Sequence, residues 1–168
     1  MSHSSIETHQ RLAQKKLIQI LKLAQSFSGL SRLGPKPPWS VTLEWVGSKT
    51  MTRLNGVFRG KFVSTDILSF PTTRIFQEQG LLGELVICLP VLKAQAKKYG
   101  TLRQEIEVLI VHGVLHLLGL DHEVNPKEAK RMARWEVKLL EALWGVRSKD
   151  PQKRLGLIDR VYSGMKVS

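Results

Sequence analysis

The chain has 168 residues, of which 42% are hydrophobic and 24% charged, and its single cysteine is Cys88. These values are typical of one soluble globular domain and exclude an internal disulfide; with no apolar run of about eighteen residues and no signal-peptide order, they favour a cytoplasmic protein. The 26 Lys and Arg against 14 Asp and Glu, a formal net charge of +12, favour a polyanionic partner, nucleic acid or an anionic membrane face, with a merely solvated basic surface as the alternative.

The first half of the chain alternates helical and extended patterns. An apolar stripe at helical spacing begins near Thr8, which we expect to be its N-cap, and strict alternation around Trp45 predicts a half-buried strand. Ser48 is expected to cap a short helix that Asn55-Gly56 ends. The predicted elements are a helix over 6–28, a loop over 28–38, a strand over 40–46, a helix over 49–55, an extended segment over 61–71 and a loop over 72–80.

The second half begins with a run so apolar that it predicts a central strand, which Pro90 ends. Pro90 is also a favourable first residue for the helix that follows. Strands and helices in this order, without strict βαβ alternation, predict an α+β fold, a small mixed sheet with helices packed on it. The predicted elements are a strand over 81–89 and helices over 91–99, 103–118 and 127–144.

Three of the five histidines lie within one segment, HGVLHLLGLDH at 112–122. His112 and His116 are four residues apart, so on a helix their imidazoles lie on one face, one turn apart. Gly119 can take the left-handed conformation that turns the chain, and this turn would bring His122 to the pair. Three imidazoles around a divalent cation with an open fourth position are typical of catalytic zinc. The alternative is that these histidines are core residues of an apolar helix.

The spacing H-x-x-x-H-x-x-G-x-x-H is that of the metzincin peptidases, with one difference. Their general-base Glu, which follows the first His, is replaced here by Gly113. The site can therefore hold zinc without being that of a protease.

Two further segments accompany the histidine segment. One joins Leu54-Asn55 to FRGK at 58–61 and TDILSFP at 65–71, and the other is LGELVIC at 82–88. In this order and spacing, the three segments resemble the YbeY family of bacterial zinc-dependent endoribonucleases, over residues of about 40 to 140. The sequence departs from the family pattern at three positions, which are Phe62 and Glu84, where Asp is usual, and Leu120, where an aromatic residue or His is usual.

The resemblance implies a fold and a domain organisation. It implies a sheet of about four strands with the metal helix across one face, and we expect residues 1–147 to form a single catalytic domain. Residues 148–168 are expected to form a basic C-terminal tail. Contact with RNA or the ribosome and a loosely docked terminus are the two open interpretations of that tail.

The resemblance also implies a function. It implies a zinc-dependent, single-strand-specific endoribonuclease that matures the 3′ end of small-subunit ribosomal RNA and takes part in quality control of assembled ribosomes. The implied partners are ribosomal RNA and the small ribosomal subunit, with ribosomal proteins or assembly GTPases as further candidates. Neither a membrane partner nor specificity for DNA is expected.

The site residues follow from the motif and from the resemblance together. His112, His116 and His122 are the predicted ligands of one Zn²⁺, which lowers the pKa of a bound water to ~7 or polarises a phosphoryl oxygen. The resemblance implies that Arg59 is catalytic together with His116. A guanidinium can contact two phosphate oxygens at once. The predicted RNA-binding residues are Arg59, Lys61 and Ser69.

Two carboxylates have open roles. Asp121 is expected to orient a ligand imidazole, with a structural turn carboxylate as the alternative. Asp66 resembles a position that lines the family's cleft, and its alternative is a local hydrogen bond to the backbone. The general base stays open, with Asp121 and Glu123 as the nearest carboxylates.

Two other functions remain open at this point. One is a zinc hydrolase of the peptidase kind, and the other is a ribosome-assembly factor whose metal is mainly structural. The basic composition and Gly113 favour the nuclease over the peptidase. An open fourth ligand position argues against a structural metal.

Overall fold

The computed structural model describes residues 3–145, and its elements form an α+β fold. The strands are β1 (Ser40–Val46), β2 (Ile67–Pro71) and β3 (Leu81–Cys88). The helices are α1 (His3–Ser26), α2 (Ser28–Ser31), α3 (Ser48–Arg59), α4 (Arg74–Gln77), α5 (Leu89–Tyr99), α6 (Leu102–Leu117) and α7 (Pro126–Trp144). The predicted tail, residues 148–168, lies outside the described residues.

The sheet is mixed and has the order β1-β3-β2. The central strand β3 is parallel to β1 and antiparallel to β2, and residues on both of its faces are buried, which explains why its sequence is apolar without alternation. The prediction of a central strand is confirmed. The prediction of about four strands is wrong by one over residues 3–145, because only the second half of the extended segment 61–71 pairs with the sheet.

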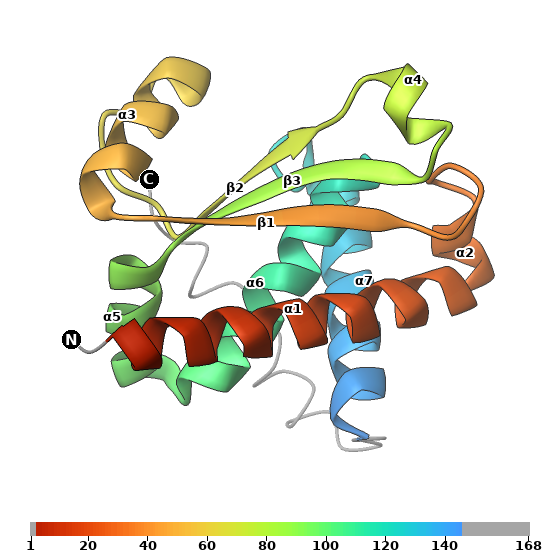
Figure 1. The fold of residues 1–168 in the computed structure, drawn as a ribbon. Coiled ribbons are helices and arrows are strands. Elements are labelled where there is room, and N and C mark those ends of the chain that lie inside the picture. The colour runs from red at the N-terminus through yellow and green to blue at the C-terminus, as the bar shows by residue number, and fades with distance from the viewer. Residues whose placement is uncertain (1–2, 146–168) are drawn as a thin grey trace.

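Helices α1, α6 and α7 pack together beneath one face of the sheet (Figure 1). Helix α6 lies among the others, in contact with β2 and β3 on one side and with α1, α5 and α7 on the others. It is therefore apolar on nearly all sides, as expected of a helix that is surrounded by protein. The buried side chains of this layer include Ala13, Leu17 and Ile20 of α1, Leu85 and Ile87 of β3, Ile106, Ile110, Val114 and Leu115 of α6, and Leu139 and Leu140 of α7.

Helix α3 covers one end of the opposite face of the sheet, as Figure 1 shows. A smaller apolar cluster joins Met51 of α3 to Leu68, Val86 and Cys88 of the sheet. Cys88 is fully buried, as its apolar surroundings in the sequence predict. This packing fixes the end of α3 relative to β2, and the loop 60–66 between them borders the functional site.

The end of α3 differs from the prediction. Asn55-Gly56 does not stop the helix, which continues to Arg59 and ends at Gly60 in the left-handed region, with φ of 69°. Asn55 is buried, and its amide Nδ2 donates to the carbonyl of Val63 at 2.9 Å. This tertiary hydrogen bond gives the Asn side chain a role inside a helix, where local propensity alone disfavours it.

Smaller differences lie at other helix ends. Ser48 is the first residue of α3 and its N-cap is Gly47, so the predicted cap is wrong. Helix α1 begins at His3, which places Thr8 inside the helix. The predicted loops 28–38 and 72–80 contain the short helices α2 and α4. In the range 3–145, no helix is both long and apolar enough to span a bilayer.

Candidate metal centre and cleft

The last turns of α6 present His112 and His116 on one face, as their spacing predicts. Their Nε2 atoms lie 3.1 Å apart. Helix α6 ends at Leu117, and Gly119 has a φ of 82°, in the left-handed region. The turn at Gly119 brings His122 back beside the pair, with its ring centroid 5.2 Å from that of His112 and 5.1 Å from that of His116.

The three imidazoles fit a single transition-metal ion. One ring nitrogen from each of His112, His116 and His122 lies within 4.8 Å of the other two. Two nitrogens at ~2.0–2.1 Å from a tetrahedral zinc are roughly 3.3–3.4 Å apart, close to the separation between His112 and His116. Imidazole nitrogens suit zinc, copper, iron or nickel, so the donor set selects this class of ion without choosing among its members.

Burial favours the neutral form, which a metal requires, for two of the imidazoles, His116 and His122. Desolvation, with the neighbouring His112 and His122 rings, lowers the pKa of His116 to about 3. Desolvation and His112 likewise lower the pKa of His122 below its usual range. A ligand imidazole must be unprotonated, so at neutral pH protons compete little with a metal for His116.

A carboxylate that the sequence analysis missed holds His112, the first predicted ligand. Oε1 of Glu136, on α7, lies 2.7 Å from Nδ1 of His112, and the Glu136 side chain is 3% exposed. A carboxylate on the second ring nitrogen fixes the tautomer and leaves Nε2 as the acceptor that faces a metal. A signal was present in the sequence, since Glu136 falls on the apolar stripe of α7 between Met132 and Leu140.

Asp121 occupies the turn between His116 and His122. Its Oδ1 accepts a hydrogen bond of 2.8 Å from the backbone N–H of Glu123, which is the local role named as the alternative for this residue. Its charge also acts on the site, because it raises the pKa of His116 and of His122 against the desolvation that lowers both. Direct orientation of an imidazole by Asp121 stays a prediction.

Gly113 faces the sheet. A Cβ at this position would lie 2.6 Å from Cδ2 of Leu85 and 3.0 Å from Cδ1 of Ile67, closer than side chains tolerate. Helix α6 therefore packs on β2 and β3 through a residue without a side chain. At the position that holds the general-base Glu in metzincins, a side chain would therefore require Leu85 to move.

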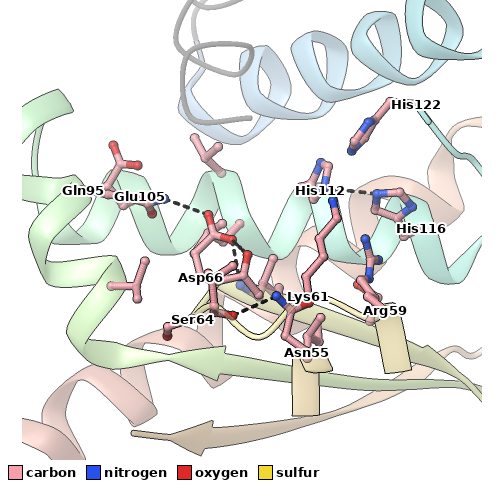
Figure 2. Close-up of a pocket in the computed structure, with 18 of the residues that line it drawn as sticks. Asn55, Arg59, Lys61, Ser64, Asp66, Gln95, Glu105, His112, His116 and His122 are labelled. Carbon is pink, nitrogen blue, oxygen red and sulfur yellow. Dashed lines mark hydrogen bonds between the residues drawn. The ribbon is translucent and has the colours of Figure 1, made fainter. Parts of the chain in front are cut away.

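The histidines line one end of an elongated cleft (Figure 2). One face of α6 forms a wall of the cleft, with residues at positions 105, 108, 109, 112 and 116. Figure 2 shows Gln95 and Glu105 at the end opposite to the histidines, with Asp66 between. The other lining side chains include Asn55, Arg59, Lys61, Ser64, Thr65, Ser69 and Glu123.

Arg59 lies at the C-terminal end of α3, on the rim of the histidine end of the cleft. A cation is favoured there by the helix dipole. Its Nη1 lies 3.7 Å from Oε2 of Glu123, and both side chains are more than a third exposed, so this pair restrains the guanidinium only weakly. Its charge lowers the pKa of His116, which shows that the guanidinium and the imidazoles share one electrostatic environment.

The other predicted binding residues also border the cleft. Lys61 lines it from the loop after α3, and Ser69 lines it from β2. Asp66 is held in place from three sides: Oδ1 accepts from the Ile67 N–H at 2.8 Å and from the Thr65 hydroxyl at 3.1 Å, and Oδ2 accepts from Nε2 of Gln95 at 2.9 Å. Asp66 thus both lines the cleft and supports its own loop.

Comparison with known proteins identifies a family that matches this chain. The family profile described as Endoribonuclease YbeY matches residues 2–144. The chain is 40% identical over 143 residues to the Endoribonuclease YbeY of Thermodesulfovibrio yellowstonii, which covers 79% of this chain and 90% of that protein. It is 37% identical over 135 residues to the Endoribonuclease YbeY of Polynucleobacter asymbioticus, over 79% of each chain.

A solved structure shares the fold. The solution structure of TM1509 from Thermotoga maritima superposes with a TM-score of 0.53 at 27% sequence identity, over 91% of each chain. The match therefore includes both the sheet and the helices around it.

Proposed function

The chain belongs to the Endoribonuclease YbeY family, and from this premise we propose that it is a zinc-dependent endoribonuclease that hydrolyses phosphodiester bonds of single-stranded RNA. One observation carries the proposal: three convergent imidazole nitrogens and the Arg59 guanidinium border the same end of one cleft. A bound divalent ion supplies Lewis acidity toward a phosphoryl oxygen and lowers the pKa of water.

The residues of the chain supply the remaining parts of the reaction. Glu136 holds the His112 ring, and burial keeps His116 neutral, so the ligand set is formed before substrate arrives. Arg59 is positioned to stabilise the negative charge that develops on the non-bridging oxygens of the scissile phosphate. In this proposal Lys61 and Ser69, which also line the cleft, contact the RNA backbone.

The substrate is proposed to be ribosomal RNA, in particular the 3′ end of the small-subunit RNA, with quality control of assembled ribosomes as a second role. The net charge of +12 favours such a polyanion, and the small ribosomal subunit with its proteins or assembly GTPases is the proposed partner. The proposed location is the cytoplasm. RNA also offers a 2′-hydroxyl as an internal nucleophile, which DNA lacks.

The competing functions receive less support from the site. A peptidase of the metzincin kind needs a carboxylate after the first ligand, and this chain has Gly113 there, packed against Leu85. An assembly factor with a structural metal would use a closed coordination shell, whereas the three histidines here face a cleft.

Metal removal tests the proposal. We expect the purified protein to cut a 5′-labelled single-stranded RNA internally, to lose this activity after chelation and to regain it with Zn²⁺. The all-deoxy strand of the same sequence distinguishes a 2′-hydroxyl nucleophile from water, since only the former requires RNA. Cleavage that survives complete removal of metal would overturn the proposal, as would cleavage of unstructured peptides in place of RNA.

Arg59 provides the matching test of charge stabilisation. We expect Arg59→Ala to lower kcat by about 10²–10³-fold, the cost of losing one preorganised donor to a developing oxyanion. Arg53→Ala is the matched control, because Arg53 is an exposed arginine of the same helix that does not line the cleft. Equal rates for the two variants would remove Arg59 from the mechanism.

A further inference from the structure

Two aromatic rings, one in the last turn of α3 and one in the loop that follows it, are unusually exposed for their size. Phe58 is 62% exposed and Phe62 is 76% exposed. The residues beside them in the chain, Arg59, Lys61 and Val63, line the cleft. The segment F-R-G-K-F therefore has an exposed ring at each end and two cations that line the cleft between them.

Both rings are supported on the protein side. The ring of Phe58 packs edge-on against Phe70 of β2, with centroids 4.9 Å apart and an interplanar angle of 69°. The ring of Phe62 lies against the backbone of α3 at Gly56, where an added Cβ would come within 2.5 Å of its Cδ1 and Cε1. Each ring is thus held from one side and open to solvent on the other.

Neither ring contributes its exposed face to the hydrophobic core, so we look to the neighbouring residues for the kind of molecule that could bind there. Guanidinium and ammonium groups beside open aromatic rings match a chain that carries both phosphates and flat bases, since stacking supplies affinity and the cations track the backbone. Unpaired bases in single-stranded RNA are free to stack on aromatic side chains, whereas paired bases are not.

We propose that Phe58 and Phe62 form a stacking platform for unpaired bases of single-stranded RNA at the rim of the cleft. The inference rests on the proposed function and deepens it, because it names the part of the protein that selects single strands. Arg59 and Lys61 bind the phosphates between the stacked bases, and the platform guides the strand toward His116.

Equilibrium binding tests the platform without cleavage, in a His116→Ala background. The probes are a fluorescein-labelled oligouridylate and an abasic oligomer of the same length, which has phosphates but no bases. Base–aromatic stacking is worth ~1–3 kcal/mol per base, so Phe62→Leu is expected to weaken oligouridylate binding by about 5- to 150-fold and to leave abasic binding unchanged. Phe62→Tyr is expected to restore it.

The matched control is Phe76→Leu, since Phe76 is a 51% exposed phenylalanine on α4 that does not line the cleft. Phe76→Leu is expected to leave both affinities unchanged. Equal oligouridylate affinity for the parent and Phe62→Leu would overturn the platform and assign the exposed rings to a protein partner, while RNA cleavage by the wild type would still stand. Failure of the wild type to bind and cleave RNA would overturn the proposed function together with the platform.

Discussion

Two polar clusters, one around the buried Glu107 of α6 and one around the half-buried histidines at the end of that helix, are built in opposite ways. In the first half of the helix, Glu107 is 1% exposed and is surrounded by donors from three helices. Nζ of Lys16 lies 2.7 Å from Oε1 of Glu107, Nε of Arg103 donates to the same atom at 3.2 Å, and Nε1 of Trp144 donates to Oε2.

The second cluster, at the other end of α6, consists of His112, His116 and His122. Its three ring nitrogens face one another and a cleft. The carboxylate of Glu136 contacts His112 from behind, on the nitrogen that points away from the other two rings.

The pKa values express the same difference. Burial alone would raise the pKa of Glu107, but the hydrogen bonds from Lys16, Trp144 and Arg103 together outweigh it and lower the pKa. For His116, burial and the like groups beside it act in the same direction and lower the pKa to about 3. A closed cluster serves the fold, whereas an open cluster of donors is kept for a ligand.

The comparison predicts its largest effect on stability at Glu107. Glu107→Ala leaves Lys16 buried without its carboxylate, and we expect the free energy of unfolding to fall by about 3–5 kcal/mol. Urea denaturation measures it. The double variant Lys16→Met/Glu107→Leu is the control, because replacement of both charges by apolar groups is expected to restore most of the loss. If the folded variants keep the metal affinity of the wild type, the Glu107 cluster and the histidine cluster have separate roles. A loss of metal affinity in parallel with stability would contradict this separation.

The second prediction concerns the contact between α7 and the metal site. Glu136→Gln keeps an oxygen that can accept from His112 Nδ1 but removes the charge, so we expect metal affinity to fall by about 10–100-fold. Competition with a chromophoric chelator measures the affinity. Glu128→Gln, at the first turn of the same helix, is the control and should bind metal as the wild type does. A Glu136→Gln protein with full metal affinity would mean that the carboxylate only fills space in the core.

The third and smallest effect is a pH dependence of the metal-free protein. The pKa of His116 is about 3 in the folded state and about 6.5 when unfolded, so the unfolded chain binds more protons between these values. Stability therefore decreases as the pH is lowered, and on going from pH 7 down to pH 5.5 we expect protonation of His116 in the unfolded chain to remove about 1 kcal/mol of unfolding free energy. The pH dependence of stability that Glu107 causes lies at lower pH, below the ordinary glutamate pKa of about 4.3. Denaturation of wild type and His116→Ala at both pH values measures the difference, and equal losses would contradict it.

The parts of this molecule that local sequence patterns determine could be predicted from the sequence. The alternation around Trp45 corresponds to β1, the apolar run before Pro90 corresponds to β3, and the spacing of His112 and His116 with the turn at Gly119 predicts that the three histidines come together. These features depend on residues that are close in the chain.

The features that depend on contacts between residues distant in the chain could not be predicted from the sequence. Asn55-Gly56 has the composition of a turn, yet the helix continues through it. The Asn55 side chain donates a hydrogen bond to the Val63 carbonyl, and the ring of Phe62 packs against Gly56. Glu136 follows His112 by more than twenty residues and belongs to no motif with it, so its contact required the packing of α7 on α6.

The most direct test of the account compares the two ends of α6 in one assay. The substrate is a ribosomal RNA fragment that carries an unprocessed small-subunit 3′ end, incubated with Zn²⁺ and with three proteins purified identically: wild type, His116→Ala and Lys16→Met/Glu107→Leu. We expect internal cleavage by the wild type and by the Lys16→Met/Glu107→Leu protein, and none by folded His116→Ala. Cleavage by His116→Ala at the rate of the wild type would contradict the claim that the histidine cluster is the centre of the activity.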